Sequence, residues 1–414
     1  MDIRRLIYIM FILSVMSLQA QARRSEILSD RIHTLQVSRN GDWQELPVIT
    51  LRTDDFIQIS FDEFTHQYNR LTYHIRHCNA DWKESSLSEI DYLDGFNDRT
   101  LDDFEYSRNT TFLYTHYVLK FPNENTRLTK SGNYEVTVTD DDSHEKLLIA
   151  RFSIQENCVG INASVTGDTD ASINDKYQQL SIKVGFGQLP VLFPASEVFV
   201  HVTQNNSDAT EVSGIGPSFF SQRELEFTHH PQLIFKGGNE FRRFEIIDMY
   251  SYMQHVDRID FYDPYFHATL MQDLPTKQYR YDEDHNGRYL VRKHEAVFSE
   301  IEADYLFVHF SLKMPEMSGG KLYLDGDFAD AGNRYKWAME YNDRTGCYEK
   351  AVLLKMGSYD YRYLWMPDGT DRMETGATEG DSYETVNDYQ IYVWFRQQGS
   401  RYDRLVGVDN VRMR

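Results

Sequence analysis

The segment Asp282–Gly287 contains the side chains with the spacing best suited to bind a divalent cation. Its residues D-E-D-H-N-G repeat the first half of a calcium-binding loop, whose oxygen ligands include loop positions one, three and five. Such a loop also needs a bidentate carboxylate at position twelve, which here is Lys293. The pair Asn286-Gly287, between Tyr279–Tyr281 and Arg288–Val291, favours a two-residue β-hairpin turn instead. We therefore predict a hairpin and no calcium site.

Histidine and cysteine do not occur with the spacing of a metal site. His74 and His77 are three residues apart in a predicted strand, so their side chains point to opposite faces. The three cysteines, Cys78, Cys158 and Cys347, are too few and too scattered for a zinc site or a disulfide framework. Cys78 and Cys158 can pair only if their Cα atoms lie within about 7 Å, and we expect no bridge. The sequence predicts neither a metal nor a cofactor.

Motifs for hydrolysis and phosphate chemistry are missing from the sequence. It has no G-x-S-x-G elbow, no P-loop and no G-x-G-x-x-G after a strand. The acidic run Asp140–Asp142 falls at the tip of a predicted hairpin. The 64 acidic residues could include a glycosidase pair, but no pattern brings two of them together. We predict that the protein is not an enzyme.

Composition excludes one class of partner. The formal net charge is −21 and the isoelectric point is about 5.1. Nucleic-acid binding depends on lysine and arginine that neutralise phosphates, so an acidic chain of this kind is not expected to bind DNA or RNA. The acidic surface favours solubility and a basic partner surface.

The first residues have the features of an export signal. Arg4 and Arg5 precede an apolar run, Leu6–Leu18, and Ala20–Ala22 reads A-Q-A, a cleavage-site pattern. The apolar run is too short to span a membrane, and Arg23 occupies the place of a lipid-bearing cysteine. We predict a signal peptide at residues 1–22, cleavage after Ala22, and an exported protein that does not span the membrane.

After residue 22 the chain consists of short runs with period-two hydrophobicity, separated by polar turns. In Phe56–Phe61, for example, Ile57, Ile59 and Phe61 share one face. No helical period is comparably strong. The pattern predicts an all-β protein with three consecutive immunoglobulin-like β-sandwich domains, at residues 23–156, 157–297 and 298–414.

The third block has the clearest strands, and Tyr359, Tyr361, Tyr363 and Trp365 should share one strand face. Its strand order resembles an early-set immunoglobulin module of the starch-binding type. That resemblance implies a platform of aromatic rings for stacking on sugars, for which the candidates are Trp337, Tyr341, Trp365 and Tyr389. Period-two aromatics are equally typical of a sandwich core. Glycan binding is therefore kept as the alternative function.

A long aromatic loop within the first block is the main candidate for partner recognition. About thirty residues separate the run ending at Trp82 from the strand that begins near Tyr114, far more than usually join two strands. The loop is rich in aromatic residues, which disordered segments lack, so we expect it to be ordered. Its candidate partner-binding residues are Trp82, Tyr92, Phe96, Phe104 and Tyr106.

The same region carries a family resemblance. The segments ISFDEF (Ile59–Phe64), HCNADW (His77–Trp82), YLDGFND (Tyr92–Asp98) and SRNTT (Ser107–Thr111) resemble the N-terminal domain of the type IX secretion system plug proteins of Bacteroidetes. Weaker likeness continues to LDGDF (Leu324–Phe328). The resemblance implies a non-enzymatic periplasmic protein that binds the outer-membrane translocon barrel of that system and seals it. A periplasmic or secreted glycan-binding protein is the alternative.

Overall fold

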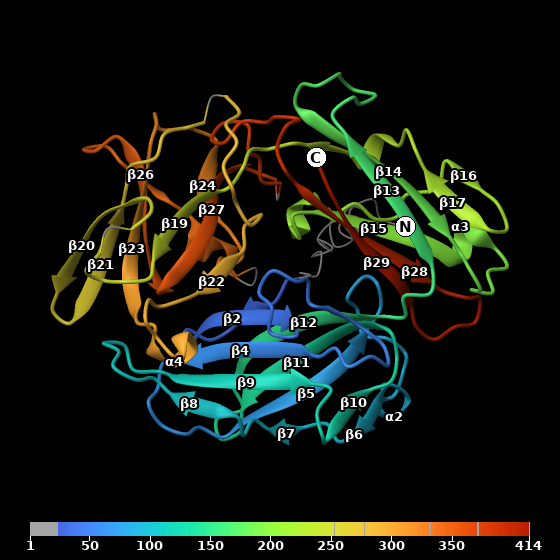
Figure 1. The fold of residues 1–414 in the computed structure, drawn as a ribbon, viewed down its shortest axis with the longest axis horizontal. Helices are drawn as coiled ribbons and strands as arrows, with labels where there is room; N and C mark the ends of the chain where they lie inside the picture. The colour runs from blue at the N-terminus through green and yellow to red at the C-terminus, as the bar shows by residue number, and fades with distance from the viewer. Residues whose placement is uncertain (1–23, 252, 277, 331–332, 371, 414) are drawn as a thin grey trace, which may run out of the picture.

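The computed structural model describes residues 24–251, 253–276, 278–330, 333–370 and 372–413, so the predicted signal peptide lies outside the described residues. The described chain is nearly all strand and forms three β-sandwiches around a common centre (Figure 1). This confirms the all-β prediction. In the described ranges, we find no helix with the length and apolar character needed to cross a membrane.

The first sandwich consists of two sheets and a separate two-stranded ribbon. The sheet orders are β1-β12-β11-β5-β7, with β3 beside β12, and β2-β4-β9-β8, and the ribbon pairs β6 with β10. One short helix, α2 (Glu89–Tyr92), precedes β6. The strands are β1 (Glu26–Ile27), β2 (Ile32–Arg39), β3 (Val48–Thr50), β4 (Ile57–Glu63), β5 (Leu71–Cys78), β6 (Leu93–Gly95), β7 (Arg99–Thr100), β8 (Phe104–Tyr106), β9 (Thr115–Phe121), β10 (Thr126–Leu128), β11 (Gly132–Asp140) and β12 (Lys146–Gln155).

The second sandwich combines residues from two distant parts of the chain. One sheet has the order β13-β14-β17-β16, with β18 beside β14, and the other has the order β15-β28-β29. Short helices α3 (Pro194–Glu197), η1 (Asp208–Thr210) and η2 (Pro231–Leu233) lie between its strands. The strands are β13 (Gly160–Thr166), β14 (Tyr177–Gly185), β15 (Val198–Gln204), β16 (Phe219–Phe220), β17 (Glu224–Phe227), β18 (Ile234–Lys236), β28 (Asp388–Phe395) and β29 (Arg404–Arg412).

The third sandwich is formed by the chain between these two parts. Its sheets have the orders β19-β27-β22, with β24 also beside β27, and β20-β21-β23-β26-β25. Helices α4 (Ser299–Glu302) and η3 (Arg334–Trp337) are its only described helical turns. The strands are β19 (Arg242–Ile246), β20 (Val256–Tyr262), β21 (Tyr265–Leu270), β22 (Tyr289–Val291), β23 (Tyr305–Lys313), β24 (Gly320–Asp325), β25 (Glu340–Asn342), β26 (Cys347–Lys355) and β27 (Gly357–Pro367).

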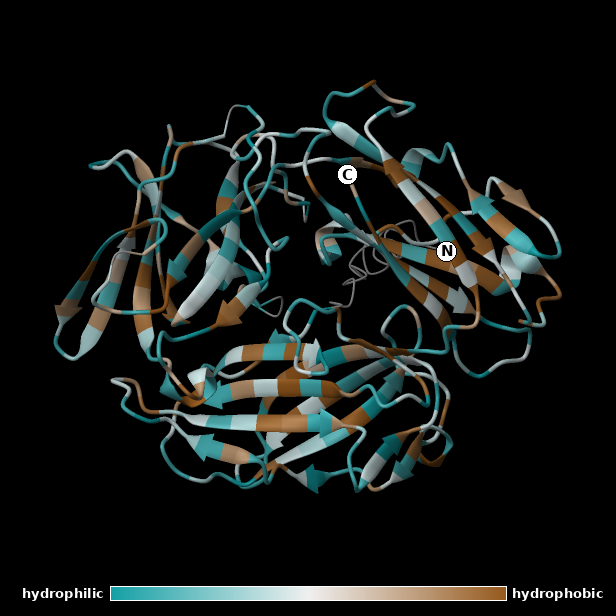
Figure 2. Ribbon diagram, in the orientation of Figure 1, coloured by the Kyte–Doolittle hydropathy of each residue, from teal (hydrophilic) through white to brown (hydrophobic). Residues whose placement is uncertain are grey.

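Period-two hydrophobicity explains why these segments become strands with one buried face. Along β4, Ile57, Ile59 and Phe61 are completely buried in the first core. Along β27, the aromatic residues predicted to share one face all enter the third core. Figure 2 shows hydrophobic bands alternating with polar ones along the strands of each sandwich. Each sandwich therefore has its own hydrophobic core.

The third sandwich is inserted within the second, which differs from a division into three consecutive blocks. Strand β28 pairs antiparallel with β15, with Val198 opposite Phe395. Tyr389, Ile391 and Val393 belong to the second core, together with Leu180 and Val200. The chain thus crosses from the second sandwich to the third between β18 and β19, and returns between β27 and β28. Residues 388–412, expected in the third domain, complete the second.

Candidate functional site

The candidate residues of the long loop do not share one environment. Trp82 and Tyr92 are buried, with exposed fractions of 7% and 4%, and Phe104 is half-buried. Phe96 and Tyr106 are exposed, at 72% and 38%. Buried rings cannot bind a partner without rearrangement of the loop. Of the five candidates, only Phe96 and Tyr106 are placed where a partner could contact them.

The structure also separates these two exposed residues. Phe96 follows β6, and Tyr106 ends β8; in Figure 1 these strands lie at opposite ends of the first sandwich. Phe96 is held against the turn between β9 and β10, because its backbone N–H donates to the carbonyl of Asn125 at 3.4 Å. At Gly95, where φ is +123°, a Cβ atom would lie 2.0 Å from that same carbonyl oxygen. Phe96 and Tyr106 therefore belong to different parts of one exposed edge.

Buried members of the loop hold it against the first sandwich. The Tyr92 hydroxyl donates to the carbonyl of Ile75 at 3.1 Å. The helix that carries Tyr92 starts with a capping box, in which Ser88 and Asp91 satisfy each other's backbone N–H groups. Phe104 packs against Tyr117, with ring centroids 5.9 Å apart. These residues position the exposed ones and are not themselves a binding surface.

Other residues of the same sequence motifs form the interface between the first and third sandwiches. The Lys355 ammonium and the Tyr305 hydroxyl donate to Asp62 Oδ2 at 2.5 and 2.6 Å. His116 Nδ1 lies 2.6 Å from Asp62 Oδ1. Burial alone would raise the pKa of Asp62, but Lys355 and His116 more than offset this and hold the pKa below its ordinary value. The interface is thus an ionic one that is fully buried.

The loop before β9 extends this interface. Backbone N–H groups of Thr111 and Phe112 donate to the Asp304 carboxylate at 2.7 and 3.1 Å. The Phe112 ring stacks on Tyr265 with centroids 4.2 Å apart, and the Tyr114 hydroxyl donates to the carbonyl of Ala303 at 2.8 Å. Sequence reasoning assigned this motif to recognition of an external partner. It contacts another part of the same chain instead.

A second motif segment, His77–Trp82, contacts the second sandwich. The Ala80 N–H donates to Asp403 Oδ2 at 3.1 Å, and Ala80 packs with Trp394 and Leu405 in a small apolar cluster. Arg404 forms an ion pair with Glu156 at 2.5 Å beside this cluster. The first sandwich therefore carries separate contact surfaces for the other two.

All three sandwiches line a central cavity of about 420 Å³. Four of the five tryptophans in the chain are in its lining: Trp43, Trp82, Trp337 and Trp394. Their rings form part of the wall of the cavity where the three sandwiches meet. Trp82, expected at a partner interface, is therefore part of the internal junction.

Arg24 contacts all three sandwiches at this cavity. Its guanidinium donates to the carbonyl of Gly326 at 3.0 Å and lies 3.4 Å from Asp327 in the third sandwich. Its backbone N–H donates to Asp208 in the second at 3.4 Å. Its carbonyl accepts from Arg151 Nη1 in the first at 2.6 Å. One residue thus ties the three bodies together.

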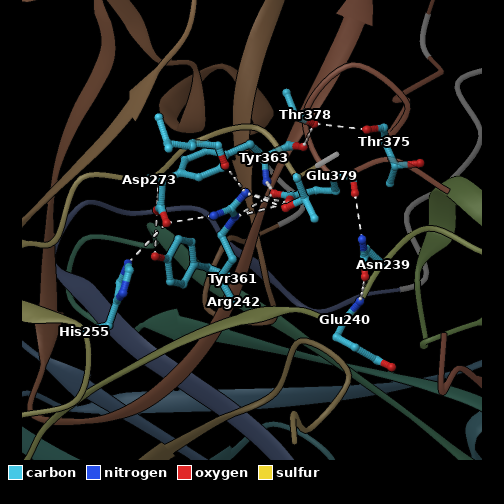
Figure 3. A network of polar contacts seen from close by, with 12 residues as sticks. Asn239, Glu240, Arg242, His255, Asp273, Tyr361, Tyr363, Thr375, Thr378 and Glu379 are labelled. Atoms are coloured by element: carbon cyan, nitrogen blue, oxygen red, sulfur yellow. Dashed lines mark hydrogen bonds and ion pairs between the residues drawn. The ribbon is translucent and has the colours of Figure 1, made fainter. Parts of the chain in front are cut away.

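A buried polar network fastens the two chain crossings between the second and third sandwiches (Figure 3). Arg242 donates to Asp273 at 2.8 Å and to Glu379 at 2.9 Å. Tyr361 and Tyr363 donate to the other oxygen of Asp273 at 2.8 and 2.7 Å. Glu379 lies on the return crossing. The network resembles a catalytic cluster in its residue types, but every oxygen of Asp273 already accepts hydrogen bonds from neighbours.

The outgoing crossing joins the same network. Asn239, between β18 and β19, donates to the carbonyl of Glu379 at 3.0 Å (Figure 3). Burial would raise the pKa of Asp273, but hydrogen bonds and the charges of His255 and Arg242 hold it below its ordinary value. The network therefore clamps both crossings with charges that stay paired at neutral pH.

The turn predicted at Asp282–Gly287 forms, but the hairpin predicted around it does not. Asn286 and Gly287 form the turn, with φ of 55° and 91°, and β22 follows it. Tyr279–Tyr281 is not a strand, because β22 pairs with β27 instead. Among the described residues, no three His, Cys, Asp or Glu side chains converge as a metal site.

Asp284 in this turn has an unusual environment. Burial, reinforced by the nearby charge of Asp360, raises the pKa of Asp284 to about 7. Asp360 is 1% exposed, and its Oδ1 accepts no hydrogen bond from the described residues. His285 packs edge-on against Trp43 of the first sandwich, and Asn286 donates to Asp388 of the second. The turn is thus a second place where all three sandwiches meet.

The aromatic platform expected for sugars does not exist as a surface. Trp337 and Trp365 are each 7% exposed and belong to the third core. Tyr341 is half-buried against the same core, and Tyr389 is completely buried in the second. Stacking on a sugar requires an exposed ring face, so these four residues do not form a glycan site. The core interpretation of their spacing is the right one.

Cysteine positions agree with the expectation that no bridge forms. Cys78 and Cys347 are buried and Cys158 is exposed, and all three are free thiols. Burial raises the pKa of Cys78 to about 12, so this thiol stays protonated. His74 is half-buried, with 44% of its side chain exposed, whereas His77 is buried, which confirms that they face opposite sides of β5.

Comparison with known proteins places this arrangement in context. Residues 32–156, which span nearly the whole first sandwich, match the family model for the type 9 secretion system plug protein 1st domain. A solved structure of a hypothetical protein from Parabacteroides merdae is similar over the full fold. It is 39% identical, with a TM-score of 0.92, and the match covers 95% of this chain and 100% of that one.

Other comparisons add no functional information. The C-terminal domains of BspA from Streptococcus agalactiae and AspA from Streptococcus pyogenes, both antigen I/II polypeptides, are 8% identical with TM-scores of 0.14 and 0.15. They cover 94% and 91% of this chain, and 98% of their own. No curated protein matches the sequence.

Proposed function

Because this chain belongs to the type IX secretion system plug protein family, we propose that it binds the system's outer-membrane translocon barrel from the periplasmic side and closes it. We propose that a signal peptide directs it to the periplasm and is cleaved after Ala22. Closure is a binding function and needs no catalysis. A wide barrel that passes folded cargo must be sealed when idle, or the outer membrane would leak.

The observation that carries this proposal is the way the family-matched sandwich is used. Its inner side holds the other two sandwiches through Asp62, Ala80 and Arg24. Its opposite edge, with β6, β7 and β8, faces away from the other two sandwiches (Figure 1). Beside this edge, α2 contacts the second sandwich through an ion pair between Asp91 and Arg401 at 3.1 Å. A body with three interlocked parts resists deformation, as a seal must. The free edge supplies a surface for docking.

Phe96 and Tyr106 are the residues of this edge that we assign to the barrel interface. Exposed aromatic side chains on ordered elements often contribute most of an interface's energy. Tyr92 and Phe104 support the loop from within and act on docking only through its shape, and Trp82 lines the central cavity. Phe96→Ala should therefore weaken binding while leaving the fold intact, whereas Tyr92→Ala should destabilise the loop itself.

Capture and permeability together test the proposal. The tagged mature protein should co-purify with the translocon barrel from outer-membrane extracts. Deleting the gene should admit a large, normally excluded antibiotic, and only in cells that retain the barrel. A deletion strain as impermeable as its parent, with no co-purification of the barrel, would show that the protein is not this plug.

A further inference from the structure

The free edge of the first sandwich carries a concentrated negative charge. Residues 84–105 contain eight acidic side chains and a single basic one, Arg99, for a formal charge of −7. This is a third of the net charge of −21 in 22 of 414 residues. The acidic residues are Glu84, Glu89, Asp91, Asp94, Asp98, Asp102, Asp103 and Glu105.

Several of these carboxylates are neutralised within the molecule, and three are not. Asp91 pairs with Arg401 at 3.1 Å, and Glu105 pairs with Arg108 at 2.9 Å. Asp94, Asp102 and Asp103 are exposed and form no ion pair with any residue in the described part of the chain. The free carboxylates are therefore available to a partner.

Two exposed apolar side chains accompany them. Ile90 in α2 is 89% exposed, and Phe96 after β6 is 72% exposed. Both are on ordered backbone: α2 has its capping box, and β6 pairs with β10, where Asp94 lies opposite Arg127. Ile90 was missed by sequence reasoning, which considered only aromatic residues. Because the backbone that carries these two side chains is already ordered, little conformational entropy of the backbone is lost when a partner binds.

We infer that this edge docks on a basic protein surface that has an apolar recess, with Ile90 and Phe96 entering the recess and Asp94, Asp102 and Asp103 facing lysines or arginines. The inference rests on the proposed function, since it describes the barrel's receiving surface. Opposite charge accelerates association, and its effect falls as salt screens it. Apolar contact at the centre limits dissociation. Association and dissociation rates therefore measure the contributions of the charges and of the apolar side chains separately.

The test measures association of the purified barrel with the mature protein and with two charge-matched variants. One is D94K/D102K/D103K on the edge. The control is D54K/D142K/D343K, which reverses three exposed carboxylates elsewhere. We expect association of the edge variant to be about tenfold slower than the parent, and that of the control to be within about twofold of the parent. Both should melt within a few degrees of the parent, as surface variants do.

Two further measurements do not depend on that edge variant. Raising salt from about 50 mM to about 500 mM should slow association of the parent about tenfold. Phe96→Ala should speed dissociation about thirtyfold with little change in association. Salt-independent association, or equal slowing by both triple variants, would overturn the inference while leaving the plug function standing. A parent that never binds the barrel would instead refute the proposed function.

Discussion

Asp62 and Asp284 both lie at junctions between sandwiches, Asp62 fully buried and Asp284 half-buried, and their surroundings are opposite. Asp62 accepts from Lys355, Tyr305 and His116, and these partners hold its pKa low. Asp284 is half-buried, and its desolvation, reinforced by the charge of Asp360, raises its pKa to about 7. The charge of Asp62 therefore stabilises its junction, whereas the charge of Asp284 destabilises its own.

The difference predicts opposite dependence on pH. A carboxylate with a depressed pKa contributes stability above its unfolded value of about 4, and that contribution is lost as pH falls through the folded pKa. A carboxylate with a raised pKa costs stability as pH rises from about 4 to the folded value, here about 7. The first–third interface should weaken in acid, and the turn at Asp284 should weaken at neutral and alkaline pH.

The largest effect is expected from Asp62→Ala at neutral pH. It leaves the Lys355 ammonium buried without its counter-charge, which should lower the free energy of unfolding by about 3–5 kcal/mol. Chemical denaturation at pH 7.5 measures this, with Asp54→Ala as the exposed control. The double variant Asp62→Leu/Lys355→Met should recover most of the loss. A single variant as stable as the parent would show that the pair is not needed.

A second paired network should respond in the same direction. Arg242→Met leaves Asp273 and Glu379 buried without their cation and should cost about 3 kcal/mol. Arg243, the next residue in β19, provides the matched control, and Arg243→Met should change stability by about 0.5 kcal/mol or less. Hydrogen exchange should locate the loss at the crossings near Asn239. Equal effects of the two substitutions would mean that the network contributes no more than an ordinary surface charge.

Substitution of Asp284 should have the opposite sign. Asp284→Asn keeps an acceptor for the Phe241 N–H and removes the charge beside Asp360. We expect the variant to be more stable than the parent by about 2 kcal/mol at pH 8, because each unit of pKa shift corresponds to about 1.4 kcal/mol and partial exposure reduces the total. At pH 4 the two proteins should be equal. A stability gain that persists unchanged at pH 4 would show that charge is not the cause.

The smallest effect concerns the residue that contacts all three bodies. Arg24→Ala removes hydrogen bonds to Gly326 and Ala329 and the contact with Asp327. Because the guanidinium is partly exposed, the cost should be about 1 kcal/mol. Thermal unfolding measures it against Arg52→Ala, an exposed arginine of the same sandwich. A loss as large as that of Asp62→Ala would make Arg24 the principal fastening of the molecule.

Local hydrophobic patterns predicted the strands, but they did not predict which strands pair with each other. The alternation of Ile57, Ile59 and Phe61 predicts a strand with one buried face, and that is what forms. The run from Asp388 to Phe395 has the same alternation whichever sheet it joins. Its pairing with β15 depends on contacts between residues nearly two hundred positions apart, which a local period does not encode. The insertion of the third sandwich was missed for that reason.

The candidate site shows the same limit. Aromatic residues in a long loop predict order, and the loop is ordered. Whether a given ring anchors the loop or meets a partner depends on where the backbone turns: Tyr92 points inward to Ile75, while Phe96 is turned outward by Gly95. The sequence held one indication of the buried ion pair at Asp62. Asp62 is a carboxylate inside a strand-like run, and such a residue either faces water or has a buried partner.

The insertion of the third sandwich sets the order in which the molecule can be completed. Strand β15 can pair with β28 only after the whole third sandwich has been synthesised, because β28 follows that sandwich in the chain. Until then Val200, Val202 and the rest of β15 lack the strand that pairs with them in the sheet. The third unit can fold as soon as its own strands arrive, because they are contiguous, whereas long-range pairing forms late. A chain that stops short of its last strands would present an open, apolar sheet edge to envelope proteases, so the protein's own topology distinguishes finished molecules from incomplete ones.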